Sequence, residues 1–426
     1  MQQRQPDPSC AIIRGVERQL GAGGDGDEAA ALARLGLEEL GGAVGGVGRI
    51  HAGVSERVFR FVGPPGRPAR AVHDAVARRA YGGIRTTFRA AARNTERAVA
   101  GRGPRLSIDP RGALALAAIN GLIGDELESR GSALVAPMAV RVGGEPVDLT
   151  PDGVDAAFPE ATSRVVVFLH GLMETEFSWS LGGREPYGER LARELGYTPV
   201  YVRYNTGRHI SENGRSLADL LAELERAWPL EWKTVALVGH SMGGLVARSA
   251  CHQAALEQAV WVHNVRHVVS LGSPHLGAPL AQAVHYASAA LHALPETRPF
   301  GAFLRRRSAG IRDLRQGSLV DDDWRDRDPD ALKAEACTEV PLLDGATHCF
   351  VSATVTRSPQ HPIGRLLGDV LVLSSSASGR SRSRRLGFED EHGLQLGGAN
   401  HFALLNHPKV YAKLRGWLAA DARAAR

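Results

Sequence analysis

Cysteine is scarce in this sequence of 426 residues, and the few cysteines form no pattern. The four are Cys10, Cys251, Cys337 and Cys349, and none of their spacings is that of a disulfide framework or a zinc ribbon. Their scarcity argues against a disulfide-stapled domain and against a zinc-stabilised one. A reducing compartment is the better expectation, and we expect no metal site.

Long apolar runs are also missing. The apolar pair Ile12-Ile13 is followed at once by Arg14, so the N-terminus lacks the uninterrupted apolar stretch of an export signal. The longest weakly apolar run, residues 113–119, is far shorter than the ~20 residues that span a bilayer. We therefore expect a soluble, cytoplasmic protein, which can still lie on a surface.

Basic residues are concentrated in one segment. Residues 49–105 contain 13 Arg, no Lys and three acidic residues, which gives this segment a net charge of +10 in a chain of net charge +5. Apolar residues with helical spacing predict helices there. Two interpretations stay open: a helical subdomain with Arg on its solvated face, or a helix pair lying on an anionic membrane or granule. Nucleic acid is not expected as a partner, because no known binding signature is present.

A glycine-rich motif near the N-terminus has no supporting context. Residues 21–26 match the dinucleotide-binding pattern G-x-G-x-x-G, but no strand precedes them and no βαβ unit surrounds them. We expect no cofactor. The chain then divides into a flexible Gly/Ala-rich segment at 1–48, a basic and mainly helical region at 49–150, and an α/β domain at 151–426.

From residue 164 onward, predicted strands alternate with predicted helices. Continuous apolar runs are typical of strands buried on both faces of a parallel sheet; they occupy 164–170, 198–204, 234–239, 266–271 and 348–355. Helices are predicted at about 185–195, from Ser216, at about 243–258 and at about 408–424. This alternation predicts a doubly wound α/β fold with helices on both faces of a mostly parallel sheet. The interruption at about 274–345 predicts a helical lid over the carboxyl edge of the strands.

The pentapeptide Gly-His-Ser-Met-Gly at 239–243 lies between a predicted strand and a predicted helix. A strand–turn–helix exposes the serine hydroxyl, and glycines flank it because the strained turn crowds its neighbours. Ser241 is therefore the candidate nucleophile, which needs a base to remove its proton. The oxyanion formed on acyl attack needs two donors, for which we expect the backbone N–H groups of Met242 and of Leu172, in the loop after the first strand.

The base and the acid are expected late in the chain, in the order Ser…Asp…His. His401, in a Gly-rich loop before the last helix, is favoured as the base, with His407 as the alternative. Asp369 is favoured as the acid, because it is the first acidic residue after the strand at 348–355, and Asp344 is a weaker candidate. The charge run at 389–391 has the character of a solvated loop.

Four stretches resemble bacterial α/β-hydrolases of the esterase and lipase kind, related to triacylglycerol lipases and to GPI inositol-deacylase-like hydrolases. They are Val-Phe-Leu-His-Gly at 167–171, Gly-His-Ser-Met-Gly-Gly at 239–244, Gly-Ser-Pro-His-Leu-Gly-Ala-Pro at 272–279 and Asn-His-Phe-Ala-Leu-Leu-Asn at 400–406. The resemblance covers roughly residues 160–420. It implies an α/β-hydrolase fold with Ser241 as nucleophile, Asp369 as acid and His401 as base, and hydrolysis of a carboxylic ester.

Three functions remain to be separated. The first is a serine esterase or lipase that forms an acyl-enzyme. The apolar lid residues Leu276, Leu280, Leu291 and Leu294 favour a lipid-like acyl chain for this enzyme, although a helix core explains them equally well. An intracellular polyester depolymerase is a variant of this first function. The second is an acyltransferase with the same triad. The third is a non-catalytic surface-binding protein that retains the fold.

Overall fold

The structure is a computed structural model that describes residues 28, 30–36, 105–278, 307–329, 331, 336–358, 360–361, 368–369, 371–380 and 385–424. The chain forms two compact units. One comprises Met1–Ser107, Leu127–Val135 and Val284–Arg306, and the other Ile108–Glu126, Ala136–Ala283 and Arg307–Arg426. The helices expected in 49–104, nearly all of the segment 1–48, and residues 279–306 of the expected lid lie outside the described residues.

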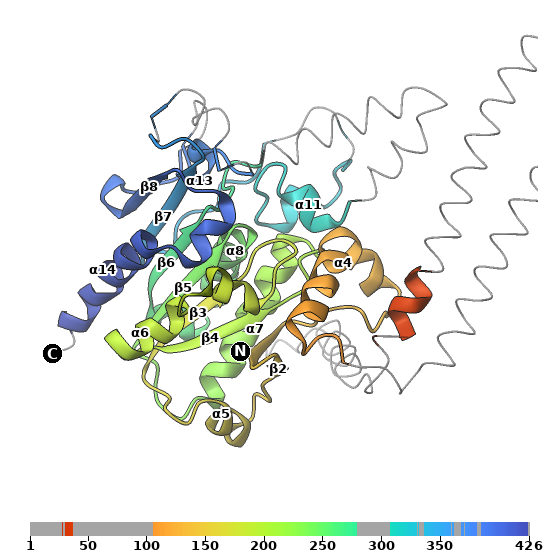
Figure 1. Cartoon of the computed structure of the whole chain (residues 1–426), viewed down its shortest axis with the longest axis horizontal. Helices are drawn as coiled ribbons and strands as arrows, with labels where there is room; N and C mark the ends of the chain where they lie inside the picture. Colours follow the sequence, from red (N-terminus) through yellow and green to blue (C-terminus); the bar gives the residue numbers. More distant parts are fainter. Residues whose placement is uncertain are drawn as a thin grey trace, which may run out of the picture. The chain divides into compact units, whose positions relative to one another are not determined.

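The second unit contains a sheet of eight strands among the described residues, in the order β2-β1-β4-β3-β5-β6-β7-β8 (Figure 1). The strands are β1 (Ala139–Val142), β2 (Glu145–Pro146), β3 (Arg164–Leu169), β4 (Thr198–Arg203), β5 (Thr234–His240), β6 (Val265–Leu271), β7 (Thr347–Thr354) and β8 (Gly393–Gly397). From β4 to β8 every neighbouring pair is parallel, whereas β1 is antiparallel to both β2 and β4.

Helices surround this sheet. They are α4 (Pro110–Ser129), α5 (Pro151–Ala157), α6 (Tyr187–Leu195), α7 (Ile210–Ala227), α8 (Met242–Leu256), α11 (Ala309–Asp313), α13 (Ser374–Ala377) and α14 (Pro408–Ala424). Short 3-10 helices are η2 (Glu176–Gly183), η3 (Val260–Asn264), η4 (Asp321–Asp323), η5 (Asp390–His392) and η6 (His401–Asn406). In the part of the chain that the structure describes, no helix is long and apolar enough to cross a bilayer.

Side chains of successive strand residues point to opposite faces of the sheet. In β3, Val165 and Val167 pack with α7 and α8 on one face, whereas Val166 and Phe168 pack with α6 and α14 on the other. Both faces are therefore buried, which explains why the strands are continuous apolar runs rather than alternating patterns. The α/β-hydrolase fold expected from the sequence is confirmed.

The sequence predicts a helix from Ser216, but α7 begins six residues earlier, at Ile210. The backbone N–H of Ile210 donates to Oδ2 of Asp313 at 2.8 Å, and the N–H of His209 donates to Glu212 at 3.2 Å. Free N–H groups at a helix start need such acceptors. The acceptor at Asp313 is 103 residues away in the sequence, so local patterns do not reveal it.

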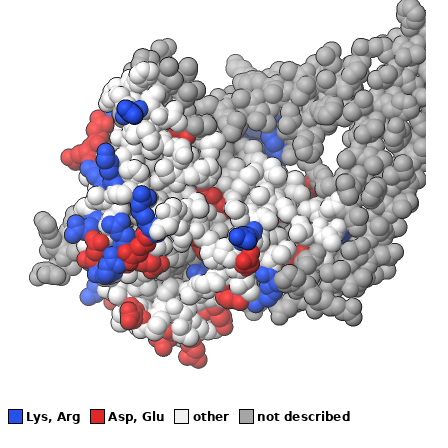
Figure 2. All heavy atoms as spheres, viewed as in Figure 1, with Lys and Arg blue, Asp and Glu red and all other residues white. Residues whose placement is uncertain are grey.

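Charged side chains of both signs are intermingled over the α6 and α14 side of the face seen in Figure 2. Arg193 contacts Glu185 and Glu194, and Nε of Arg415 lies 2.7 Å from Oε2 of Glu194. These exposed pairs contribute little stability each. This surface does not bear on the anionic-surface hypothesis for 49–105, which stays a prediction because residues 49–104 lie outside the described part of the chain.

Candidate active site

Ser241 occupies the turn between β5 and α8 with φ 51° and ψ −119°, a backbone conformation that non-glycine residues rarely adopt. Its N–H donates to the carbonyl of Leu271 at 2.8 Å. The neighbouring glycines are required by space: a Cβ atom at Gly239 would lie 2.3 Å from the backbone N of Gly244, and one at Gly243 would lie 2.3 Å from the carbonyl O of Leu169. The expected strand–turn–helix is therefore present.

Asp369 and His401 are hydrogen-bonded to each other. Nδ1 of His401 lies 2.7 Å from Oδ2 of Asp369, and both side chains are buried. The other carboxylate oxygen, Oδ1, accepts the N–H groups of Leu371 and Val372 at 3.0 and 2.8 Å. Each oxygen of Asp369 thus has a donor, which fixes the carboxylate and the imidazole ring that it orients.

His401 is also close to the Ser241 turn. A Cβ atom on Gly272, the residue after Leu271, would lie 3.1 Å from Cε1 of His401. The ring of His240 lies 4.7 Å from the ring of His401, measured between centroids. The loops that carry Ser241, Asp369 and His401 therefore meet at the carboxyl edge of neighbouring parallel strands, where α/β proteins bind ligands.

The two alternative residues lie elsewhere. Asp344 is exposed in the turn before β7, at the amino end of that strand. His407 ends η6, where its Nδ1 accepts the N–H of Lys409 at 3.2 Å at the start of α14. Asp344 thus lies at the edge of the sheet opposite the Ser241 turn, and Nδ1 of His407 is used at the start of α14, whereas Asp369 and His401 are bonded to each other, so the geometry favours the latter pair.

The loop after β3 approaches the serine closely. A Cβ atom on Gly171 would lie 3.0 Å from Cβ of Ser241. Leu172 follows, and Met173 has a positive φ of 60° that turns the loop. Met242 is the first residue of α8, so its N–H has no partner within the helix. Both N–H groups expected to bind an oxyanion therefore belong to backbone next to Ser241.

A buried ion pair beneath this loop was not foreseen from the sequence. Oε2 of Glu174 accepts the N–H of Gly171 at 2.8 Å and lies 2.9 Å from Nδ1 of His240. Burial alone favours the uncharged form of each group, but the electrostatic attraction and the hydrogen bond between Glu174 and His240 outweigh the effect of burial. The pKa of Glu174 is therefore lowered and that of His240 is raised. Both shifts favour the charged forms, a carboxylate at Glu174 and an imidazolium at His240, the residue before Ser241.

His170 shapes the same loop in a different way. Burial lowers its pKa, and its ring stacks on Tyr204 with centroids 4.4 Å apart. Nδ1 donates to the carbonyl of Gly171 at 2.9 Å, while Nε2 accepts the N–H of Tyr204 at 3.3 Å. One nitrogen donates and one accepts, so the ring is neutral and both nitrogens are occupied by backbone.

Helix α4 supports the loop from its other side. A Cβ atom on Gly121 would lie 2.4 Å from Cγ of Met173. The carbonyl of Gly121 accepts the hydroxyl of Ser308 at 2.6 Å, and Asp125 accepts the N–H of Ala309 at 2.9 Å. Residues before the predicted start of the α/β domain at 151 therefore contact the candidate site and the segment that carries α11.

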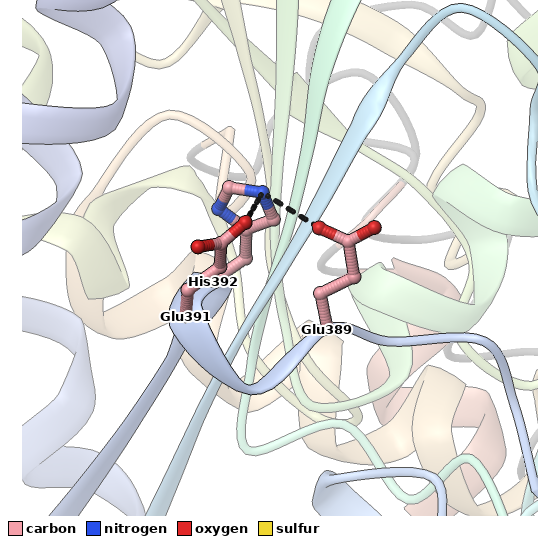
Figure 3. Close-up of side chains that lie close together, drawn as sticks. All are labelled: Glu389, Glu391 and His392. Atoms are coloured by element: carbon pink, nitrogen blue, oxygen red, sulfur yellow. Dashed lines mark ion pairs between the residues drawn. The ribbon is translucent and has the colours of Figure 1, made fainter.

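A possible metal-binding group and a cavity lie away from Ser241. Among the described residues, Glu389, Glu391 and His392 could offer ligand atoms to a metal (Figure 3). Both carboxylates are exposed and Nε2 of His392 already pairs with them at 3.2 and 3.7 Å, so this is an ion-pair cluster on η5. A cavity of about 470 Å³ lies between the β1–β2 hairpin, η2 and α6, and none of the candidate catalytic residues lines it.

Comparison with known proteins gives limited matches. The family described as "Domain of unknown function (DUF7379)" matches residues 146–293, roughly a third of the chain. No curated protein matches the chain. Among solved structures, the lipase BlEst2 of Bacillus licheniformis in its mature form is 21% identical with a TM-score of 0.38, covering 60% of this chain and 91% of that one.

Two further solved structures are similar at the same level. The lipase of Staphylococcus hyicus is 15% identical with a TM-score of 0.36, covering 62% of this chain and 95% of its own. EstA of Clostridium botulinum is 12% identical with a TM-score of 0.37, covering 73% and 98%. At such identities and scores the likeness does not bear on which reaction this chain catalyses, so the functional argument depends on the site itself.

Proposed function

We propose that this α/β-hydrolase-fold protein is a serine hydrolase that cleaves carboxylic esters through an acyl-enzyme. The observation that carries the proposal is the buried 2.7 Å hydrogen bond between His401 and Asp369, next to a strained turn that presents Ser241. A base oriented by a carboxylate beside a serine on such a turn is the arrangement that activates a hydroxyl.

Acylation follows from this geometry. Oγ of Ser241 attacks the ester carbonyl carbon while Nε2 of His401 accepts the hydroxyl proton, and Asp369 stabilises the resulting imidazolium. The carbonyl oxygen becomes an oxyanion that accepts hydrogen bonds from the N–H groups of Leu172 and Met242. When the tetrahedral intermediate collapses, His401 returns the proton to the departing alcohol.

Deacylation repeats these steps with water. His401 removes a proton from the water that attacks the acyl-enzyme, and then protonates Oγ of Ser241 as the carboxylic acid leaves. Phe402, with 51% of its surface exposed and its ring 5.8 Å from that of His401, offers an apolar contact beside the reacting atoms. Esters with an apolar acyl or alcohol part, lipid-like or small, are therefore the substrate class that we propose.

Hydrolysis of p-nitrophenyl esters over a series of acyl chain lengths tests this proposal. We expect acyl release into water without an added acceptor, and at least a ~1,000-fold loss of kcat in Ser241→Ala. Acyl transfer that requires an added alcohol or thiol would instead favour the acyltransferase. No turnover of any ester by the folded wild-type protein would contradict the proposal.

A further inference from the structure

His240 joins the three segments that carry the candidate catalytic groups. It directly precedes Ser241, its Nδ1 lies 2.9 Å from Oε2 of Glu174, and its Nε2 lies 3.2 Å from the carbonyl oxygen of His401. The same oxygen of Glu174 accepts the N–H of Gly171 at 2.8 Å. His240 thus connects the serine turn, the loop of the expected oxyanion donors and the loop of the expected base.

With Glu174 ionised, the hydrogen-bond partners of His240 assign the protons of its ring. A backbone carbonyl can only accept, so Nε2 of His240 donates to His401. An ionised carboxylate can also only accept, so Nδ1 donates to Glu174. Both ring nitrogens then carry protons, and the imidazolium is neutralised by the carboxylate beside it. The opposite pKa shifts of the two groups agree with this assignment.

A neutral substitute for Glu174 cannot maintain the bridge. One oxygen of Glu174 accepts from both Gly171 and His240, and glutamine cannot reproduce this with a neutral His240. If the amide oxygen of glutamine takes this place, His240 needs its one proton on Nδ1 and no longer donates to the carbonyl of His401. If the NH₂ group takes this place, it can donate to Nδ1 but cannot accept the N–H of Gly171. A charged His240 would keep both bonds, but it would be buried without a counter-charge. In every case, the bridge loses one of its hydrogen bonds or holds a buried charge without a partner.

We propose that Glu174 and His240 are positioning residues that set the distance between Ser241, the backbone of Leu172 and the ring of His401. This inference rests on the proposed ester-hydrolase function. Neither residue touches the reacting atoms; each acts through the loops that it holds. Displacement of a reacting group by about 1 Å can lower a rate by up to ~100-fold, so loss of the bridge should slow the chemical steps more than it weakens substrate binding.

The test compares two buried carboxylates. Glu176 provides the matched control, because its buried carboxylate also pairs with a cation, with Oε2 2.6 Å from Nε of Arg203, and this partner lies on β4 rather than next to Ser241. We expect E174Q to lower kcat for p-nitrophenyl butyrate about 10- to 100-fold with little change in KM, and E174D to retain more activity than E174Q. E176Q should leave kcat within about 3-fold of wild type.

Two outcomes overturn the inference and are distinguishable. If E174Q and E176Q have the same kcat while the wild-type enzyme is active, Glu174 has no positioning role and the ester-hydrolase function stands. If the folded wild-type protein neither hydrolyses esters nor reacts with a fluorophosphonate, the function and the positioning role both fail. Should E174Q not fold, His240→Asn carries the same test, since it keeps a donor toward Glu174 and loses the bond to His401.

The protonation state has a readout that does not depend on activity. In protein labelled with ¹⁵N-histidine, we expect the imidazolium of His240 to persist to a higher pH than that of a histidine in an unfolded chain. It should disappear in His240→Asn, which assigns it, and in E174Q. A His240 ring that loses its proton at or below the ordinary pKa of histidine would contradict the proposed bridge.

Discussion

Nδ1 of His401 lies 2.7 Å from Oδ2 of Asp369, with both side chains excluded from solvent. The carboxylate is itself held by two backbone N–H groups, so it is fixed before it orients the ring. This relationship carries the functional argument, because it selects one histidine and one acidic residue from the many in the chain.

Replacement of the acid tests that relationship. Asp369→Asn keeps the size of the side chain, but its NH₂ group favours the wrong tautomer of His401 and removes the charge that stabilises the imidazolium. We expect kcat to fall by about 1,000-fold or more with the fold intact. Asp344→Asn is the control, since Asp344 is exposed at the other end of β7, and should have wild-type kcat. Equal activity of the two variants would contradict the role of Asp369.

Substitution of a glycine by alanine tests how crowded the backbone is at the Ser241 turn. A Cβ atom at Gly239 would lie 2.3 Å from the backbone N of Gly244, so Gly239→Ala must displace the turn. We expect a loss of ~1–3 kcal/mol or more in the free energy of unfolding, together with a large loss of kcat. Gly416, on α14, has nothing within 4 Å of its Cβ position.

Gly416→Ala is therefore the matched control for the turn. It should raise the free energy of unfolding by about 0.5–1 kcal/mol, because alanine restricts the unfolded chain and favours the helix, and it should leave kcat unchanged. Urea denaturation of both variants measures the effect. A Gly239→Ala protein as stable and active as Gly416→Ala would show that the turn is not crowded.

The stability contributed by Glu174 and His240 should depend on pH in a specific window. The pKa of Glu174 is lowered from 4.5 in the folded state, so its contribution is present above that value and is lost as pH falls through the folded pKa. The pKa of His240 is raised from 6.5, so its contribution is present below that value and is lost as pH rises through the folded pKa.

The stability difference between wild type and E174Q should therefore be widest between about pH 4.5 and 6.5, at roughly 3–5 kcal/mol, and should narrow on both sides. Urea denaturation at about pH 3, 5.5 and 9.5 measures it. A difference that does not change with pH would mean that the two groups are not an ion pair.

Asp313 anchors α11 to the start of α7. Its carboxylate accepts the N–H of Ile210 at 2.8 Å and lies 3.0 Å from Nδ1 of His209, whose ring stacks on Trp324. Asp313→Asn keeps one acceptor but loses the charge at the helix start, so we expect a loss of about 1–3 kcal/mol in stability. Proteolysis should also become faster within 307–324. Unchanged stability and cleavage would exclude this anchoring role.

Local patterns predicted the central part of the fold well, for an identifiable reason. Strands β3 to β7 are buried on both faces and so read as continuous apolar runs, and the serine turn needs glycines at fixed positions. The edge strands β1, β2 and β8 were not predicted, because they are short and partly exposed. Helix α4 was not placed at the site either, since its contacts with Met173 and Ser308 join residues far apart in sequence.

The pair of Glu174 and His240 shows the same limit at the site. Both residues lie inside motifs recognised from the sequence, but 66 residues separate them. Nothing local indicates that one carboxylate oxygen serves both the ring and the N–H of Gly171. His407 and Asp344 were reasonable alternatives for a similar reason, since only the folded chain shows which end of β7 and which side of η6 faces Ser241.

Covalent labelling by a fluorophosphonate, followed by peptide mapping, tests the central claim most directly. The account predicts one modified residue, Ser241, with labelling abolished in Ser241→Ala and slowed at least ~100-fold in folded His401→Gln. Labelling at another residue, or a folded wild-type protein that does not react, would contradict the assignment of Ser241 as an activated nucleophile.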